Sequence, residues 1–444
     1  MDFRRIMPIT KFWAYLLITS QFALVLSAVL PDGNSHPKIA PREEQGVTQN
    51  GDLKAFSMQC PGYAFPQVIC ISRCGSLIHG DFERKVRDVV GDSDTYESTS
   101  APSEPTFQDI SYADFLVWDT SVGFEILGPQ PSVEFIFAVD NASHVGPVYA
   151  PTTNELYFSR LSLGFLPQLV IDLNQNPPTL SERVANPPIY AGTGGRFYKG
   201  LIYFSTIGGN SSLEGHSFRP GVYTLDPRTG KSNVIVNNYY GYYFNGVDDL
   251  EIDDHGQIWF TDNNYGRTSH VNTHAPQMGV GTYRFNTSSG LVSLVEDSLL
   301  EPNGIIFSPD FQTLYLSDTG AGSVVIDDRV VPAPPLAYNS TGARTTYAYD
   351  VSNSRKRLLN KRVLYRAIEY VADGIGISRE GYLVAGTGHG VDILSADGEP
   401  LVRVQTNFTV LNTAWAGKES DELWAFGKGG IARIRLALKG PKPE

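Results

Sequence analysis

The sequence predicts an all-β fold, a six-bladed β-propeller, and three observations support this prediction. First, only 18% of the 444 residues are charged, against about 25% in an average soluble domain, which disfavours long surface helices. Second, from about residue 110 onward short β-rich segments alternate with Gly, Asp, Asn and Pro turns, with almost no helical periodicity. Third, one short phrase recurs six times along this region.

The recurring phrase is a turn followed by an aliphatic residue, an aromatic or apolar pair, and a small or acidic residue. It reads ELYFS, LIYFS, QIWFT, TLYLS, YLVAG and ELWAF, around Leu156, Ile202, Ile258, Leu314, Leu383 and Leu423. The spacings of 46, 56, 56, 69 and 40 residues suit one four-stranded blade, and units too short to bury a core alone are expected to join in a ring. A β-sandwich also repeats turn–strand phrases, but six of them at similar spacing favour the propeller.

The N-terminal residues 1–28 are predicted to be a cleaved signal peptide. Basic residues up to Lys11 precede an apolar run, 12–28, which ends in small residues. An uncleaved membrane anchor is the alternative, but a run of 17 residues is short for a span of about 20. We therefore expect a secreted protein with no stable membrane insertion after cleavage.

Five Asn-x-Ser/Thr sequons agree with a secretory route and are candidate glycosylation sites: Asn141, Asn210, Asn286, Asn339 and Asn407. Each triplet alone is a weak signal, because such triplets also arise by chance and need an exposed loop to be used.

Residues 29–110 are predicted to form an N-terminal extension that contains Cys60, Cys70 and Cys74. Three cysteines this close in an oxidising compartment predict one local disulfide and one odd thiol. A three-cysteine metal site is the alternative, but no His or fourth Cys lies beside it. The propeller itself is assigned to residues 111–440.

A second phrase precedes three of the repeats. It reads VDDL at 247–250, PNGI at 302–305 and ADGI at 372–375. If the apolar run after each phrase is the innermost strand of its blade, then Asp248, Asn303 and Asp373 point toward one mouth of the central channel. Each dipeptide alone is ordinary turn chemistry, but three in the same register indicate a site. The loops that close the next hairpins, 262–265 and 386–389, should rim the same face.

Two carboxylates and a carboxamide are hard oxygen ligands that suit Ca²⁺, Mg²⁺ or Mn²⁺. A metal there would polarise a carbonyl and activate water, and Asp373 would serve as the general base. Further candidates are less specific. Asp249, His144, His389 and Asp262 are assigned to the surroundings of the substrate and of the metal ligands, with turn formation or structural hydrogen bonding as the alternative for Asp249 and both histidines. The run Gly192–Gly195 is read as a turn, because the strand–loop–helix context of a phosphate-binding motif is missing.

The stretches FNGVDDLEIDDHGQIWFTDNNYG, EPNGIIFSPDFQTLYLSDTG and ADGIGISREGYLVAGTG resemble the senescence marker protein/gluconolactonase/luciferin-regenerating family, with the secreted fungal lactonohydrolases most similar. The resemblance covers roughly residues 115–440. It implies a six-bladed propeller, a divalent metal, usually Ca²⁺, at the channel centre, and hydrolysis of lactones. A related branch, diisopropyl fluorophosphatase, cleaves organophosphates at a similar site.

The resemblance also implies a ligand set. Asn303 matches the Asn of the family's Pro-Asn-Gly motif, and Asp373 matches the Asp that is both ligand and proposed base. Asp248 stands where the family usually has Asn. The family's Glu in a His-Glu-Gly-Pro-Val phrase is replaced here by Val145, whose side chain cannot bind a metal.

We therefore expect a secreted lactonase-like hydrolase that opens a small-molecule lactone or cyclic ester with Ca²⁺-activated water. Two alternatives stay open. One is an enzyme of a secondary-metabolite pathway, performing cyclisation, isomerisation or hydrolysis with weakened or lost metal dependence. The other is a non-catalytic ligand-binding propeller, because this architecture hosts many functions. The net charge of −12 disfavours nucleic acid as a partner.

Overall fold

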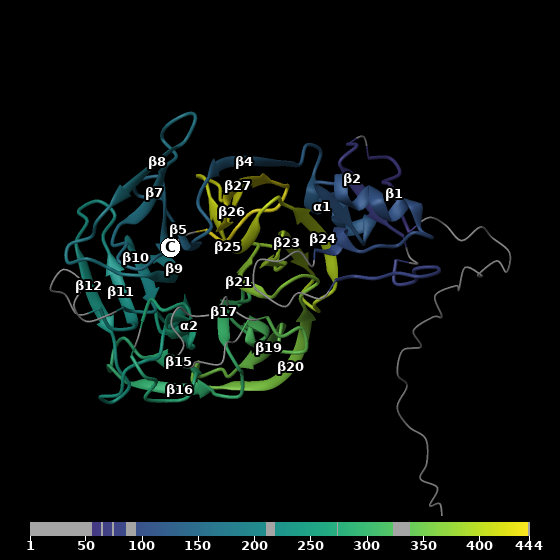
Figure 1. The fold of residues 1–444 in the computed structure, drawn as a ribbon. Coiled ribbons are helices and arrows are strands. Elements are labelled where there is room, and N and C mark those ends of the chain that lie inside the picture. Colours follow the sequence, from purple (N-terminus) through teal and green to yellow (C-terminus); the bar gives the residue numbers. More distant parts are fainter. Residues whose placement is uncertain are drawn as a thin grey trace, which may run out of the picture. The chain divides into compact units, whose positions relative to one another are not determined.

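The computed structural model describes residues 56–442, except for 64, 73–74, 86–94, 210–217, 273 and 323–337. The predicted signal peptide, Cys74 and Asn210 lie outside the described residues. One compact unit runs from Leu53 to Glu444, and its described part is a β-propeller (Figure 1).

Five sheets of the described chain have four strands each. The first consists of β5 (Ser143–Ala150), β6 (Glu155–Leu161), β7 (Gln168–Asp172) and β8 (Thr179–Arg183). The second consists of β9 (Gly192–Tyr198), β10 (Leu201–Thr206), β11 (Gly221–Leu225) and β12 (Ser232–Val236). The third consists of β13 (Val247–Ile252), β14 (Ile258–Asp262), β15 (Gly281–Phe285) and β16 (Val292–Glu296). The fourth consists of β17 (Pro302–Phe307), β18 (Thr313–Asp318), β19 (Thr345–Val351) and β20 (Leu358–Arg366). The fifth consists of β25 (Thr409–Ala416), β26 (Glu422–Lys428), β27 (Gly430–Arg435) and β4 (Ser132–Ala138).

A further sheet has seven strands. Its order is β21 (Ala372–Ile377), β22 (Leu383–Thr387), β23 (Gly390–Leu394), β24 (Pro400–Gln405), β3 (Phe115–Val117), β2 (Val68–Ile71) and β1 (Ser57–Gln59). The described helical segments are short: η1 (Tyr96–Ser98), η2 (Pro105–Tyr112), α1 (Thr120–Leu127), α2 (Tyr265–Thr268) and η3 (Gly320–Gly322).

The prediction of a β-propeller is confirmed, but the prediction of six blades is corrected. In the described chain five blades are regular four-stranded sheets. The unit around Leu383 belongs to the seven-stranded sheet, because β3 pairs with β24 and β2 pairs with β3. The innermost strands β5, β9, β13, β17, β21 and β25 contact one another in that order, and β25 contacts β5. The seven-stranded sheet therefore completes the ring.

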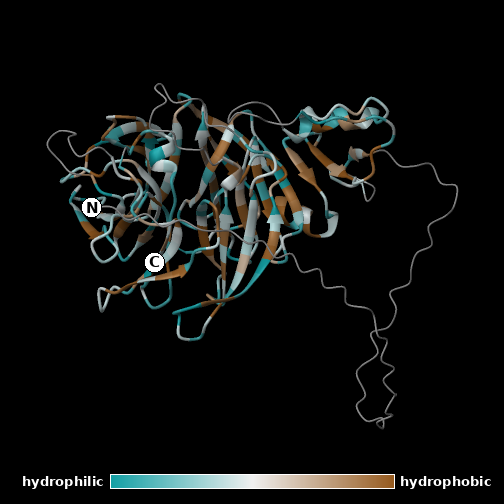
Figure 2. Ribbon diagram, turned by 60° about the horizontal axis from the view of Figure 1, so that its bottom comes forward, coloured by the Kyte–Doolittle hydropathy of each residue, from teal (hydrophilic) through white to brown (hydrophobic). Residues whose placement is uncertain are grey.

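Each recurring phrase forms the second strand of its sheet: β6, β10, β14, β18, β22 and β26. Most aromatic residues of these strands are buried between neighbouring sheets, and Phe158, Phe260 and Trp424 are fully buried. Strands covered on both faces read as continuous apolar runs rather than as alternating patterns. Figure 2 shows hydrophobic stretches along the strands of the ring and hydrophilic ones in many of the connecting turns.

The N-terminal part of the described chain is tied to the ring in two ways. Cys60 and Cys70 form a disulfide, which confirms the prediction of one local disulfide in the extension. The second is the parallel pairing of β2 with β3. This pairing places a strand of the predicted extension, 29–110, and a strand of the predicted propeller, 111–440, in one sheet.

A buried ion network lies next to these strands. The Arg403 guanidinium is fully buried and contacts Asp392 Oδ1 at 2.5 Å and Glu369 Oε2 at 2.6 Å. The backbone N–H of Tyr96 donates to Glu369 Oε1 at 2.6 Å. Because Tyr96 precedes the ring in the chain, this network links the extension to the propeller.

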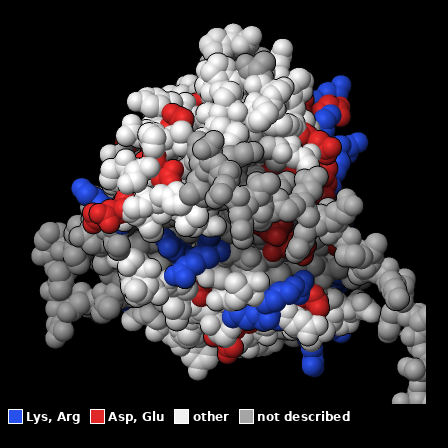
Figure 3. Space-filling model, turned by 90° about the vertical axis from the view of Figure 1, so that its right-hand side faces the viewer, with Lys and Arg blue, Asp and Glu red and all other residues white. Residues whose placement is uncertain are grey.

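The predicted glycosylation sites in the described chain lie at least partly at the surface. Asn141, Asn339 and Asn407 are exposed and Asn286 is half-buried, so glycosylation there stays a prediction. No helix within the described ranges is long and apolar enough to span a membrane. Figure 3 shows acidic and basic side chains interspersed on one face.

Replacing Arg403 by Leu should lower the free energy of unfolding by about 3–5 kcal/mol, because it leaves two buried carboxylates without their cation. Arg435→Leu is the matched control. Arg435 pairs with Glu422 at 3.0 Å, but about half of its side chain is exposed (48%), so its loss should cost less than ~1 kcal/mol. Urea denaturation measures both. Equal costs for the two variants would contradict the assigned importance of the network.

Candidate functional site

Irregular pairing of the inner strands positions the three predicted polar residues. In β13, β17 and β21 the pairing with the second strand shifts register between the first and fourth residues of the phrases VDDL, PNGI and ADGI. In each strand the first residue inside the irregularity is the predicted one: Asp248, Asn303 or Asp373. A local irregularity of this kind changes the direction of a side chain relative to a regular strand. The three therefore occupy equivalent places at the same end of the channel.

The structure brings these three side chains together. The Asn303 amide hydrogen-bonds the Asp373 carboxyl, and the charge of Asp373 acts on Asp248. Asp248 and Asn303 are buried, whereas Asp373 keeps partial exposure to solvent. The result is a pair of carboxyl groups with one amide between inner strands at the mouth.

Burial dominates the electrostatics of the pair. It raises the pKa of Asp373 to about 7, opposed by the ammonium of Lys428 and by the Asn303 hydrogen bond. The pKa of Asp248 is raised well above its ordinary value, first by burial and next by the nearby charge of Asp373. Two neighbouring carboxyls in a low-dielectric site resist being ionised together.

Several residues around the pair were missed in the sequence. Asn263 Nδ2 donates to Asp248 Oδ2 at 2.7 Å and to the carbonyl of Pro302 at 3.0 Å. The Tyr265 hydroxyl donates to Thr319 Oγ1 at 2.7 Å, and burial raises its pKa well above the usual value, so it remains protonated. Asn263 lies in the loop after β14 and Tyr265 begins α2 directly after that loop, and Asn263 brings this segment to the mouth. The predicted position of loop 262–265 was the signal that could have identified them.

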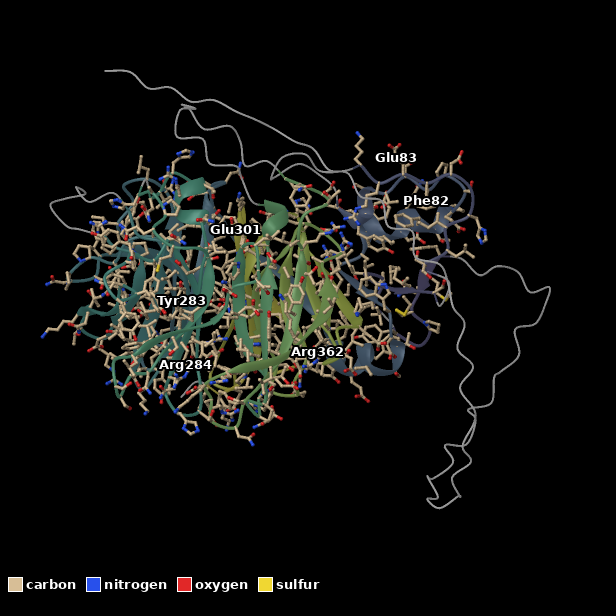
Figure 4. All side chains as sticks on the ribbon, turned by 90° about the horizontal axis from the view of Figure 1, so that it is seen from below. Phe82, Glu83, Tyr283, Arg284, Glu301 and Arg362 are labelled. Carbon is tan, nitrogen blue, oxygen red and sulfur yellow. A yellow bond between two sulfur atoms is a disulfide. The ribbon has the colours of Figure 1, made fainter. Side chains whose placement is uncertain are left out.

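Glu301 and Lys428 carry no recognisable motif, and only the fold brings them near the pair. Glu301 is buried, accepts the backbone N–H of Asn264 at 3.0 Å, and raises the pKa of Asp248 as a further, smaller cause. Lys428 ends β26 and acts electrostatically on Asp373. In Figure 4 Glu301 lies toward one rim of the ring, with Arg284 and Arg362 toward the other.

Asp262 supports the site through the backbone. It is fully buried, and its Oδ1 accepts the N–H of Gly246 at 2.7 Å, just before β13. Asp318 does the same before β17, because its Oδ1 accepts the N–H of Glu301 at 3.0 Å. Burial raises the pKa of Asp262 to about 7. Asp262 and Asp318, the last residues of β14 and β18, therefore fix the backbone just before β13 and β17, the strands that carry Asp248 and Asn303.

Asp249 faces the neighbouring strand β9. A Cβ at Gly194 would lie 2.1 Å from Asp249 Oδ1, so the close approach requires glycine there. The run Gly192–Gly195, read as a turn in the sequence, instead begins β9. The mistake has a physical cause: these glycines mark close packing of a strand against neighbouring residues, such as Asp249 beside Gly194, and not a bend.

The two candidate histidines have partners outside the carboxyl pair. His144 is buried, with Nδ1 3.1 Å from the carbonyl of Gly427 and Nε2 3.7 Å from Asp140. Burial lowers its pKa. The backbone N–H of His389 donates to Glu369 Oε2 at 2.9 Å, which ties this loop to the Arg403 network.

The first blade supplies an apolar wall. Val145 is buried in a cluster with Ala321, Tyr338, Tyr370, Val371 and Leu411. The irregularity in β5 falls between Val145 and Val148, and the two residues between them are Gly146 and Pro147. Within this segment of β5 no side chain offers an oxygen to the site.

The donor set of the site meets the needs of a divalent cation in part. Within the described residues no three His, Cys, Asp or Glu side chains form a metal-binding group. The site combines two carboxyls and one carboxamide, all of which carry the oxygen donors that Ca²⁺ prefers. A cation would also relieve the repulsion between the Asp248 and Asp373 carboxylates. The residues therefore fit a hard cation, with three side-chain ligands.

Comparison with known proteins identifies relatives over nearly the whole chain. The family model described as SMP-30/Gluconolactonase/LRE-like region matches residues 213–330. Lactonohydrolase oryL of Aspergillus oryzae is 63% identical over 403 residues, covering 90% of this chain and 92% of that protein. Lactonohydrolase oryH of the same organism is 41% identical over 460 residues, covering 91% and 97%.

Solved structures share the fold at low sequence identity. A gluconolactonase of Xanthomonas campestris is similar with a TM-score of 0.57 and 20% identity, over 72% of this chain and 94% of that one. A calcium-binding protein, regucalcin, of Agrobacterium tumefaciens is similar with a TM-score of 0.52 and 14% identity, over 70% and 96%. At these identities the likeness supports the fold alone.

Asp373→Asn should stabilise the metal-free protein increasingly as pH rises. An Asp in an unfolded chain has a pKa near 3.9, whereas the pKa of Asp373 is about 7 in the fold. The cost of ionising it therefore grows with pH up to about 7 and then stays constant, reaching a few kcal/mol at most. Urea denaturation from pH 5 to pH 8 with chelator measures the trend. Asp350→Asn on the surface is the control, and an advantage of Asp373→Asn that does not change with pH would contradict the assignment.

Proposed function

Because this chain belongs to the SMP-30/gluconolactonase/LRE-like family, we propose that it is a lactonase-like hydrolase that opens a lactone or a similar cyclic ester. The observation that carries this proposal is the meeting of Asp248, Asn303 and Asp373 at one mouth of the channel. Two relatives that match about nine-tenths of this chain are named lactonohydrolases, and this supports a lactone as the substrate.

The reaction adds water to the carbonyl carbon and breaks the ring C–O bond, giving a hydroxy acid. Asp373 is suited to take the proton from water, because its pKa of about 7 in the metal-free site matches the operating range of a general base. It would then return that proton to the departing ring oxygen. Asp248 and Asn303 would hold the site's geometry, and the Tyr265 hydroxyl stays protonated beside it.

We propose Ca²⁺ as the cofactor, held by Asp248, Asn303 and Asp373. When bound, a divalent cation polarises a carbonyl and lowers the pKa of water. The fit of the donor set supports this assignment, and one protein that shares the fold is named as calcium-binding. The chain would carry out this chemistry in the secretory pathway, as the N-terminal residues and sequons indicate.

A metal-independent enzyme is the second candidate, and two observations favour it. The described segment of β5 at the mouth offers no side-chain oxygen, and Lys428 already places a protein cation where it acts on Asp373. In that case Asp373 would perform acid–base chemistry, including cyclisation or isomerisation, without a metal. A propeller that only binds its ligand is the third possibility.

Hydrolysis of a panel of γ- and δ-lactones, followed by pH-stat titration, separates these proposals. The wild-type protein should open at least one lactone, and Asp373→Asn should lower kcat about 10²–10⁴-fold, the usual contribution of a general base. Asp350→Asn should retain full activity. Loss of activity in chelator, restored by Ca²⁺, supports the metal-dependent enzyme, and chelator-resistant activity supports the second candidate. Binding of a lactone without turnover would leave the third.

Val145→Glu tests whether Val145 borders the proposed metal site. The added carboxylate would lie in an apolar cluster, so without metal the variant should be destabilised. If the metal site lies where we place it, Ca²⁺ should bind more tightly in calorimetric titration and restore the midpoint of thermal unfolding. Val145→Gln controls for polarity without charge. Unchanged Ca²⁺ affinity in the Glu variant would show that Val145 does not border the metal site.

A further inference from the structure

A cavity opens at the end of the central channel opposite to the mouth that holds Asp248, Asn303 and Asp373. Its volume is about 390 Å³, within the range of small-molecule sites. Every inner strand contributes to its wall, through residues such as Val148, Arg196, Glu251, Ile306 and Thr413. The cavity is therefore built by the ring itself and not by one loop.

The cavity is separate from the carboxyl pair. Its lining residues Glu251, Ile306 and Gly376 follow Asp248, Asn303 and Asp373, respectively, by three positions on the same strands. Strands rise about 3.3 Å per residue, so the two sites are about 10 Å apart along the channel. None of the residues assigned to the catalytic site lines this cavity.

Aromatic residues form a large share of the apolar part of the wall. They come from four different sheets and from the loop after β17: Tyr149, Phe197, Tyr198, Phe307, Phe311 and Trp415. The Trp415 indole N–H is already satisfied, because it donates to the carbonyl of Ile377 at 2.9 Å. Its ring is thus held in place and offers an apolar surface.

The charged side chains of the wall favour an anion. Three cationic residues, Arg196, Arg379 and Lys442, line the cavity together with only one carboxylate, Glu251. Glu251 is satisfied without any ligand, because it accepts Arg196 Nε at 2.8 Å and the N–H of Ile252 at 2.9 Å. A third of the Arg196 side chain is exposed (35%). Arg196 Nη1 makes no hydrogen bond to any described residue, so the guanidinium retains donors for a second carboxylate.

The C-terminal segment forms part of the rim. A Cβ at Gly440 would lie 2.2 Å from the Trp415 ring, so this segment lies directly against the indole. Arg379 holds it there, through its N–H to the carbonyl of Lys439 at 2.7 Å and its Nη2 to the carbonyl of Gly440 at 3.2 Å. Pro441 and Lys442 then complete the lining.

We propose that this cavity is a second ligand site, which binds an organic carboxylate with an apolar alkyl or aryl body. The carboxylate would bind at Arg196, with Arg379 and Lys442 adding positive charge. The apolar body would pack on Trp415 and the neighbouring aromatic rings. The site is independent of the hydrolase proposed above, since its residues are distinct.

Octanoate is the probe, compared with octylammonium, which has the same chain length and the opposite charge. Octanoate should bind saturably in a 1:1 ratio in isothermal titration and should change the Trp fluorescence. Trp415→Phe should remove the fluorescence change. That loss would identify Trp415, among the five tryptophans, as the one that reports octanoate binding. Octylammonium should bind at least about tenfold more weakly, the worth of a charged hydrogen bond.

Two variants test the location. Gly376 lines the cavity, and a Cβ there would meet its nearest neighbour, Thr413 Oγ1, at an ordinary 3.5 Å, so the fold has room for a side chain at this position. Gly376→Val should therefore fill part of the cavity and abolish octanoate binding. The double variant Arg196→Gln with Glu251→Gln keeps a neutral polar pair, and should weaken octanoate binding about tenfold while leaving octylammonium unaffected. Circular dichroism confirms folding, and the double variant carries the test if Gly376→Val does not fold.

The proposal is wrong if octanoate shows no saturable binding at millimolar concentration, or if octylammonium binds equally well. It is also wrong if binding survives Gly376→Val in a folded protein. Lactone hydrolysis by Gly376→Val should match the wild type, which separates this result from failure of the hydrolase proposal.

Discussion

The antiparallel pairing of β4 with β27 joins a strand that precedes β5 in the chain to one near the C-terminus. This pairing completes the fifth four-stranded sheet, and through it the ring of inner strands closes. The channel and both of its mouths exist only while that ring is closed, because each inner strand contacts its neighbours on either side. Closure also spares the inner strands from presenting open edges. The position of every site residue therefore depends on strands that are distant in the chain.

The carboxyl pair at one mouth is costly to the fold. Asp248 and Asp373 are drawn into a low-dielectric site where neither ionises readily, and nothing in the folding of the blades requires two acids there. Hydrogen bonds from Asn263 and Asn303, and the charge of Lys428, offset only part of that cost. Such unfavourable placement of ionisable groups is common at functional sites. The same groups that weaken the metal-free protein would provide the reactivity of the hydrolase.

Much of the architecture was predictable because it is local. The aromatic pairs of the recurring phrase predict buried second strands, and residues such as Trp424 are fully buried there. The three polar residues at the start of inner strands were predictable from their common spacing to those phrases. The seven-stranded sheet was not, because β3 joins β24 across nearly 300 positions of sequence and neither strand shows this in its own pattern. The glycine run at 192–195 was misread for a similar reason: Gly194 lies against Asp249, on another blade.

By itself, the sequence determined the fold class, the second strands, the presence of one local disulfide in the extension, and the three polar residues of the mouth; the pairing of Cys60 with Cys70 came from the structure. These follow from short-range patterns of hydrophobicity, turn residues and cysteine spacing. Only the tertiary structure decided which other groups surround Asp248 and Asp373, among them Glu301 and Lys428, and that the opposite mouth opens into a cavity. Those features depend on side chains that meet across blades, and the electrostatic effect of such meetings is set by distance and burial, which spacing along a chain does not encode.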